Sequence, residues 1–165
     1  MPLDAEDVIG YRVYRGPMTG IVNCVTDWVR TDSRKCRYFA CLNPHSADLA
    51  SGDPFFHNSL NCAEFLTADG IGIVYASRIL GGRIRERITG MDVFQGVSEA
   101  LNRDGGASYF FLGSTNETLE AIRKRMADDY PNIEVAGTYS PPFRPEFTDE
   151  DNEKMVTAIN ECSPD

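Results

Sequence analysis

The chain has 165 residues and a mass of 18.3 kDa, which is the size of a single domain. Its 16 Lys and Arg residues against 25 Asp and Glu residues give a net charge of -9, which argues against a general nucleic-acid-binding protein. Hydrophobic residues at 42% and charged residues at 25% are typical of a globular protein and exclude intrinsic disorder. We therefore expect one domain over residues 1–165.

The sequence gives no indication of secretion or membrane insertion. Its first residues, Met-Pro-Leu-Asp-Ala-Glu-Asp, lack the basic and apolar regions of a signal peptide. No uncharged apolar stretch reaches the roughly 18 residues that a membrane span needs. The five cysteines form no CxxC pair, which favours reduced thiols in a cytoplasmic protein.

Short apolar runs alternate with helical patterns along the chain. The runs predict strands at Tyr11–Tyr14, Arg37–Leu42, Glu64–Thr67, Ser108–Leu112 and Ile133–Gly137. The helical patterns lie at 21–29, 46–51, 71–79, 91–101 and 115–128, and a capping-box sequence at Thr148–Asp151 opens a last helix. In the helix at 71–79, the predicted buried face consists of Ile71, Val74, Tyr75 and Ile79.

This alternation predicts an α/β fold with a Rossmann-like, mostly parallel sheet and helices on both of its faces. The chain stops at Asp165, directly after a helix, where the pattern requires another strand. The sheet is therefore expected to lack its last strand.

Ligands of open parallel sheets bind beyond the carboxyl ends of the strands, so the loops at these ends are the candidate site. Four loops qualify: Asn43-Pro44-His45, Asp69-Gly70-Ile71-Gly72, Gly113-Ser114-Thr115, and the segment from Tyr139 to Phe143. We expect all four to converge on one rim, where they would supply a carboxylate, an amide, a close backbone approach and an aromatic face.

Asp69 has two interpretations of equal weight. As an ionised carboxylate beside a cleft, it can accept a proton from a hydroxyl nucleophile, a role typically worth about 10²–10⁴-fold in rate. Alternatively, it caps the helix that starts near Gly70, which aspartate does well. The two roles are compatible.

An arginine-rich segment runs from Arg78 to Gly90 in this otherwise acidic chain. Four arginines stand against one acid, Glu86; they are Arg78, Arg83, Arg85 and Arg87. The planar guanidinium suits phosphate oxygens, so a diphosphate is a natural ligand, whereas the simpler interpretation is a solvated basic loop. Thr89-Gly90-Met91-Asp92 adds a helix start whose N–H groups can face an anion.

Other patterns exclude or weaken alternative functions. The segment at 69–74 lacks the third glycine of GxGxxG, which disfavours a dehydrogenase. His45 and His57 have no neighbours at metal-ligand spacing, so no metal site is expected. Gly113-Ser114-Thr115 is similar to a phosphate-binding turn. Tyr139 either stacks on a nucleobase or covers the edge of the sheet.

Several of these motifs occur together in a known order. They are Asp69-Gly70-x-Gly72-x-Val74, Arg78, Gly81-Gly82, Arg87-x-Thr89-Gly90-x-Asp92, Phe111-Leu112-Gly113, Tyr130-Pro131 and Gly137-Thr138. In this order and spacing, from about Cys41 to Asn160, the chain resembles the WecG/TagA/CpsF glycosyltransferases, which form glycosyltransferase family 26.

The resemblance implies an inverting, metal-independent transferase without a cofactor. Such an enzyme moves a sugar, N-acetylmannosamine-type or hexose, from a UDP donor to an undecaprenyl-diphosphate-linked sugar for teichoic acid or another surface polysaccharide. It implies that Asp69 is the base and that Asn43 lies near the donor sugar. Arg87, Thr89, Gly90 and Asp92 are then expected to bind substrate, and Gly113 and Tyr139 the nucleotide.

The sequence departs from the family pattern at two places. Cys41 and Leu42 replace the Thr and Pro of a Thr-Pro-Asn motif, which leaves the donor sugar open. The final strand and the C-terminal appendage that touches the membrane are absent, so the chain is a fragment, a deliberately shortened protein or a natural truncation. The alternative function is a non-catalytic nucleotide-binding or assembly module. Peripheral membrane contact is expected only of the full-length form, and self-association is possible.

Overall fold

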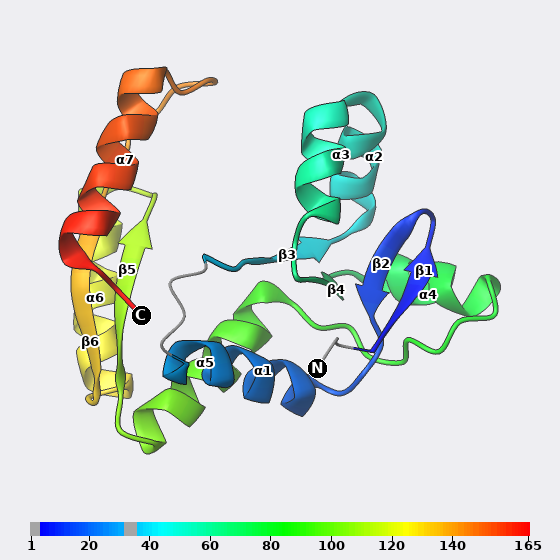
Figure 1. Cartoon of the computed structure of the whole chain (residues 1–165), viewed down its shortest axis with the longest axis horizontal. Coiled ribbons are helices and arrows are strands. Elements are labelled where there is room, and N and C mark those ends of the chain that lie inside the picture. Colours follow the sequence, from blue (N-terminus) through cyan, green and yellow to red (C-terminus); the bar gives the residue numbers. More distant parts are fainter. Residues whose placement is uncertain (1–3, 32–35) are drawn as a thin grey trace. The chain divides into compact units, whose positions relative to one another are not determined.

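The computed structural model of the chain describes residues 4–31 and 36–165 (Figure 1). The chain divides into two compact units, Met1–Val97 and Ser98–Asp165. The boundary falls within one helix, α5 (Gly90–Arg103). The expectation of a single domain stays a prediction, and each unit is described below by itself.

The first unit is built on a four-stranded sheet with the order β1-β2-β4-β3. Strands β1 (Ala5–Val8) and β2 (Tyr11–Tyr14) form an antiparallel hairpin. Strand β4 (Phe65–Ala68) pairs in parallel with β2 on one side and with β3 (Phe39–Leu42) on the other. The carboxyl ends of β2, β3 and β4 therefore lie at one edge of this sheet.

Helices cover both faces of this sheet (Figure 1). From one face of β4, Phe65 contacts Trp28 of α1 (Met18–Arg30), with ring centroids 5.7 Å apart. From the other face, Leu66 packs in a core that includes Leu60 of α3 (Pro54–Asn61) and Val74 of α4 (Ile71–Ile79). Helix α2 (Pro44–Gly52) contributes Ala50 to the same core.

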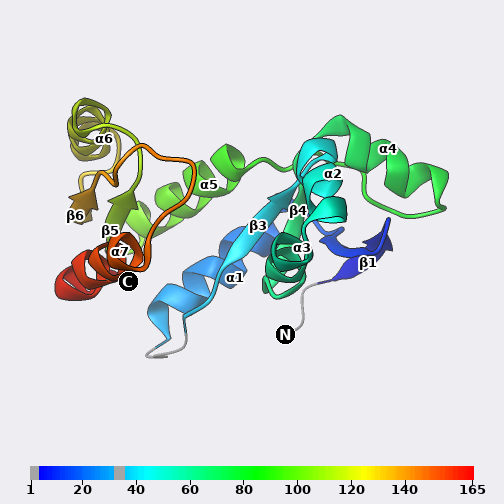
Figure 2. The same ribbon diagram turned by 90° about the horizontal axis from the view of Figure 1, so that it is seen from above.

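The second unit contains a parallel pair, β5 (Ala107–Leu112) and β6 (Ile133–Tyr139). Figure 2 shows α6 (Asn116–Asp129) and α7 (Asp149–Cys162) on opposite sides of these strands. Helix α7 starts with the predicted capping box, because the Thr148 hydroxyl accepts the Asp151 N–H while the Asp151 carboxylate accepts bonds from Thr148.

The mixed α/β class and the parallel strands predicted from the sequence are confirmed. Two elements were not predicted. Strand β1 lies in an acidic segment, and α3 begins at Pro54, between the helix predicted over 46–51 and the strand predicted at Glu64–Thr67. The helix begins there because Asp53 accepts the N–H groups of Phe55 and Phe56, and Pro54 occupies its first turn.

The predicted buried face of α4 is wrong. Only Val74 of the predicted set is buried, whereas Ile71, Tyr75 and Ile79 are exposed. Ile73 and Ser77 are buried in their place. Ser77 is held there because its hydroxyl donates to the carboxylate of Glu6 in β1, a contact that the sequence pattern does not reveal.

Glu6 fixes the start of the arginine-rich loop. Its carboxylate accepts the N–H of Arg83 at 2.7 Å and the N–H of Ile84 at 3.3 Å, in addition to the hydroxyl of Ser77. Burial raises the pKa of Glu6, but these hydrogen bonds outweigh it, and the pKa lies below its ordinary value. The loop is therefore tied to the first strand through one ionised side chain.

We predict that Glu6→Gln lowers the free energy of unfolding by about 1–3 kcal/mol at neutral pH. Because the folded-state pKa is lowered, the stabilisation is fully present above the ordinary value of 4.5 and is lost as the pH falls through the folded-state value. Urea unfolding at several pH values measures this difference. Glu86→Gln, an exposed acid in the same loop, is the control. A gap between Glu6→Gln and wild type that stays constant below pH 4.5 would contradict the assignment.

Candidate functional site

The ends of β3 and β4 bring two predicted site residues together. Leu42 and Ala68 are register partners, and Asn43 and Asp69 follow them directly. The backbone N–H of Asp69 donates to the carbonyl of Leu42 at 2.9 Å. The convergence predicted for the loops after these two strands is therefore confirmed.

Two glycines allow the loop after β4 to lie against Asn43 and Pro44. Gly70 has a φ of +152°, and a Cβ there would lie 3.3 Å from Cδ of Pro44. A Cβ on Gly72 would lie only 2.7 Å from Cγ of the same proline, which is closer than real Cβ contacts. Glycine is required at both positions, at Gly70 for the backbone angle and at Gly72 for the close approach.

The carboxylate of Asp69 is half-buried and is not a helix cap. The N-cap of α4 is Gly70, and no side chain caps this helix. Within residues 4–31 and 36–165, no hydrogen bond or ion pair engages the Asp69 carboxylate. Of the two interpretations weighed from the sequence, the capping role is wrong, and the group is left open for a ligand.

Cys41 faces this carboxylate from β3. The hydroxyl of Thr67 donates to its Sγ at 3.3 Å, and the backbone of Gly90 also bonds it. Burial raises the pKa of the Cys41 thiol, the bond from Thr67 lowers it, and the negative charge of Asp69 raises it further, so that the net shift is upward. Cys41 is therefore a neutral thiol beside the candidate base, at the position where the family pattern has threonine.

Asn43 has a structural role in addition to its predicted one. Its Oδ1 accepts the N–H of Ser46 at 2.9 Å, and the Ser46 hydroxyl accepts the N–H of Asn43 at 2.9 Å, which caps α2. The carbonyl oxygen of the amide therefore points to the helix. Contact with a donor sugar, which stays a prediction, is left to the amide nitrogen.

Thr89 and Asp92 cap the start of α5. The Asp92 carboxylate accepts the N–H and the hydroxyl of Thr89, both at 2.8 Å, and the Thr89 hydroxyl accepts the N–H of Asp92 at 3.1 Å. These bonds, with a smaller contribution from the charge of Arg87, hold the pKa of Asp92 below its usual value despite some desolvation. Asp92 thus fixes the helix start, and the side chain of Arg87 in the preceding loop is exposed. Their predicted contacts with substrate are untested.

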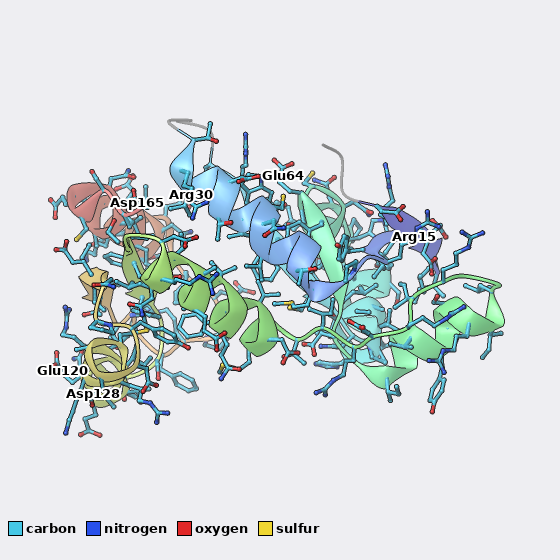
Figure 3. All side chains as sticks on the ribbon, turned by 90° about the horizontal axis from the view of Figure 1, so that it is seen from below. Arg15, Arg30, Glu64, Glu120, Asp128 and Asp165 are labelled. Atoms are coloured by element: carbon cyan, nitrogen blue, oxygen red, sulfur yellow. The ribbon has the colours of Figure 1, made fainter. Side chains whose placement is uncertain are left out.

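The loop after β2 is a part of this rim that the sequence analysis missed. A cavity of about 100 Å³ lies among Arg15, Gly16 and Pro17 of this loop, Ala68 at the end of β4, and Arg85. Arg15, labelled in Figure 3, pairs with Asp4 at 2.7 Å, while its Nε is buried without a hydrogen-bond partner among the described residues. The sequence did indicate this position, because Arg15 follows the carboxyl end of the predicted strand Tyr11–Tyr14.

The two predicted nucleotide-binding residues meet in the second unit. Leu112 and Tyr139 are register partners, and the N–H of Gly113 donates to the carbonyl of Tyr139 at 2.9 Å. That N–H is therefore already engaged, which limits its use for an anion. Gly113 itself has a φ of +126°, with open space where a Cβ would stand.

His57 has a structural role. The ring of His57 bonds the hydroxyl of Tyr11 at 3.0 Å and the side-chain amide of Asn61 at 2.9 Å, which ties α3 to β2. No cluster of His, Cys, Asp and Glu able to hold a metal ion occurs in the described part of the chain. All five cysteines are free thiols there. None of the described helices is both long enough and apolar enough to cross a membrane.

Comparison with known proteins agrees with the family resemblance found in the sequence. The model of the glycosyl transferase WecG/TagA/CpsF family matches residues 6–165. The chain is 31% identical over 96 residues to an N-acetylglucosaminyldiphosphoundecaprenol N-acetyl-beta-D-mannosaminyltransferase of Bacillus subtilis (strain 168), which covers 58% of this chain and 37% of the relative. It is 25% identical over 159 residues to the protein of that name in Staphylococcus aureus (strain NCTC 8325 / PS 47). This second match covers 96% of this chain and 60% of the relative. Each match thus spans less than two thirds of the relative.

The contact between Gly72 and Pro44 predicts a specific cost. We expect Gly72→Ala to lower the free energy of unfolding by about 1–3 kcal/mol, because the new Cβ overlaps a rigid proline ring. Gly52→Ala, which has nothing within 4 Å, is the matched control and should leave stability unchanged or raise it by up to about 1 kcal/mol. Urea denaturation measures both. Equal stability of the two variants would show that the loop does not lie on Pro44.

The thiol of Cys41 reports on the position of Asp69. Burial and the Asp69 charge both raise its pKa, so its alkylation by iodoacetamide at pH 7.5 should be slower than that of the exposed Cys36 and Cys62. Asp69→Asn removes the facing charge and should accelerate the modification of Cys41 while leaving Cys62 unchanged. Peptide mass spectrometry over time measures both rates. If Asp69→Asn leaves the Cys41 rate unchanged, the two side chains are not neighbours in solution.

Proposed function

The chain belongs to the WecG/TagA/CpsF glycosyl transferase family, and we propose that it transfers a sugar from a UDP donor to an undecaprenyl-diphosphate-linked sugar. The names of the Bacillus and Staphylococcus relatives specify an undecaprenol-diphosphate-linked acceptor and an N-acetylmannosaminyl group. For this chain, we propose an N-acetylmannosamine-type sugar or a hexose as the transferred group. The product is a unit of a cell-surface polysaccharide.

The open carboxylate of Asp69 is the observation that carries this proposal. It stands at the carboxyl end of a parallel strand, beside Asn43 and Cys41, and no described residue engages it. An aspartate that caps a helix or forms an ion pair has a structural role. The carboxylate of Asp69 forms no such bond with the described residues. A position open to ligand and next to neutral polar groups is what a general base requires.

The proposed step is a single displacement with inversion. Asp69 accepts the proton of the acceptor hydroxyl as the oxygen forms its bond to the anomeric carbon of the donor sugar. The bond from that carbon to the diphosphate breaks at the same time, and UDP leaves with the electron pair. The proton remains on Asp69 until solvent removes it, and the reaction uses no metal.

The developing charge on the diphosphate needs a positive group, and Arg87 is the proposed one. Its guanidinium is exposed and lies near Asp92, which is fixed at the start of α5 by Thr89. We propose that Gly113 and Tyr139 contact the nucleotide in the second unit. The reaction takes place at the inner face of the plasma membrane, since the acceptor is anchored in lipid.

The direct test is the exchange of Asp69 for asparagine. We predict that Asp69→Asn lowers the rate of transfer from a UDP-sugar by about 10²–10⁴-fold, because the proton acceptor is lost while the size of the side chain is kept. Asp48→Asn in α2 removes one carboxylate at an exposed position and should keep the wild-type rate. Release of UDP, coupled to product detection, measures both. An unchanged rate in Asp69→Asn would remove this residue from the reaction.

Titration of UDP and of a UDP-sugar by calorimetry separates the transferase from the alternative of a non-catalytic module. Binding accompanied by transfer supports the proposal. Binding without transfer to any lipid-linked acceptor would favour a nucleotide-binding or assembly role.

A further inference from the structure

The cavity where β2 and β4 end is not used by any step of the proposed reaction, although it adjoins the candidate site. Its volume is about 100 Å³. Three buried apolar residues belong to its lining: Ala68, Ile84 and Ile88. Ala68 directly precedes Asp69, and the carbonyl of Ala68 accepts the N–H of Ile88 at 3.0 Å. A ligand in this cavity therefore lies beside the proposed base.

The polar part of the lining offers a hydrogen-bond donor and an acceptor that the protein does not use. Nε of Arg15 is buried and has no hydrogen-bond partner within the described part of the chain, whereas Nη2 of the same guanidinium pairs with Asp4 at 2.7 Å. The carboxylate of Glu86 is exposed and forms no hydrogen bond or ion pair with the residues that the structure describes. Because a buried N–H group without an acceptor is unfavourable, Nε of Arg15 is suited to bind an oxygen atom from a ligand.

The charges around the cavity are balanced, which argues against an anionic ligand. Arg15 is paired with Asp4, and the lining contains both Arg85 and Glu86. Nη1 of Arg85 donates to two backbone carbonyl groups of its own loop, each at 3.3 Å. A phosphate group would meet no surplus of positive charge here. The cavity is suited instead to a neutral group that accepts one hydrogen bond, donates another and has an apolar part.

We propose that this cavity receives the acetamido group of an N-acetylated sugar. The carbonyl oxygen of that group accepts the N–H at Nε of Arg15, and its own N–H donates to the carboxylate of Glu86. Its methyl group lies against Ala68, Ile84 and Ile88. The size agrees, since a liquid such as water uses about 30 Å³ per non-hydrogen atom and an acetamido group has about four such atoms.

This inference deepens the proposed function and rests on it, because it assigns one part of the sugar substrate to residues of the same rim. A hexose carries a hydroxyl group in place of the acetamido group. A hydroxyl bound to Arg15 leaves the apolar part of the cavity in contact with water, so the cavity favours the acetylated sugar. Arg15 is then a residue that determines specificity. The donor and the acceptor can each carry an acetamido group, and the experiment distinguishes these two sources.

The test compares two pairs of compounds whose members differ only in the acetamido group. The donor pair is UDP-N-acetylmannosamine and UDP-mannose, and the acceptor pair is N-acetylglucosaminyl diphosphate and glucosyl diphosphate, each as a short alkyl ester. Calorimetric titration of the 165-residue protein measures the four dissociation constants. In at least one pair, we expect the acetamido compound to bind about tenfold more tightly than its partner. The pair that shows this preference identifies the source of the group.

Three variants separate recognition of the acetamido group from a structural role of Arg15. Arg15→Met removes Nε and should reduce the preference from about tenfold to about twofold or less, by weakening the acetamido compound alone. Asp4→Asn removes the ion pair but keeps Nε, so it should keep the preference. Arg12→Met, the same exchange at an exposed position of β2, is the matched control and should also bind both compounds as wild type.

Equal affinities within both pairs would overturn the proposal, and so would an Arg15→Met variant that weakens both members of a pair equally. Transfer assays with the same donors separate this inference from the proposed function. Equal binding and equal transfer of the two donor sugars, without a preference in the acceptor pair, would contradict the acetamido site and leave the transferase intact. Selective binding of an acetamido compound without transfer would do the reverse. Failure of all four compounds to bind would contradict both.

Discussion

The candidate site depends on the close packing of two glycines against one proline. Gly70 and Gly72 bring the backbone after β4 onto Asn43 and Pro44, and the parallel pairing of β3 with β4 sets the height at which the two loops meet. The same contact leaves α4 without a side-chain cap, because Gly70 occupies the cap position. Asp69 is consequently freed from the role that an aspartate before a helix usually has. The catalytic hypothesis thus follows from a packing constraint.

A second constraint, the contact between Glu6 and Ser77, explains why part of the fold could not be predicted from the sequence. Apolar runs and helix starts predicted the parallel strands and most helices, since these patterns are local. The strand around Glu6 is acidic and was missed; it pairs with β2 in a hairpin, and its Glu6 side chain bonds residues more than 70 positions away, which no local pattern reveals. Without Glu6, the burial of Ser77 has no visible reason. The predicted buried face of α4 therefore included Ile71, Tyr75 and Ile79, which are exposed, and did not include Ser77, which is buried.

The residues of the candidate site, like the strands and helices, could be predicted from the sequence in part. Asn43 and Asp69 could be placed together because the carboxyl ends of neighbouring parallel strands meet. Thr89 and Asp92 carry the pattern of a capping box, and their contribution as a helix start was accessible from sequence, whereas the position of Arg15 was not. Arg15 belongs to a loop that shares a cavity with Ala68 at the end of β4 and with Arg85 in the loop after α4, both of which are distant in sequence. Only the strand order β2-β4-β3 brings them to one edge.

These two constraints together explain why large apolar side chains remain exposed on α4. Gly70 and Gly72 fix the start of the helix, and Glu6 with Ser77 fixes its rotation about its own axis, so Ile71, Tyr75 and Ile79 have no freedom to turn inward. Rotation that buried them would expose Ile73 and break the bond between Ser77 and Glu6. An apolar face held outward by hydrogen bonds and packing persists only if its exposure is tolerated or used. The outward face of α4 is therefore a consequence of the same two contacts that hold Asp69 at the carboxyl end of β4.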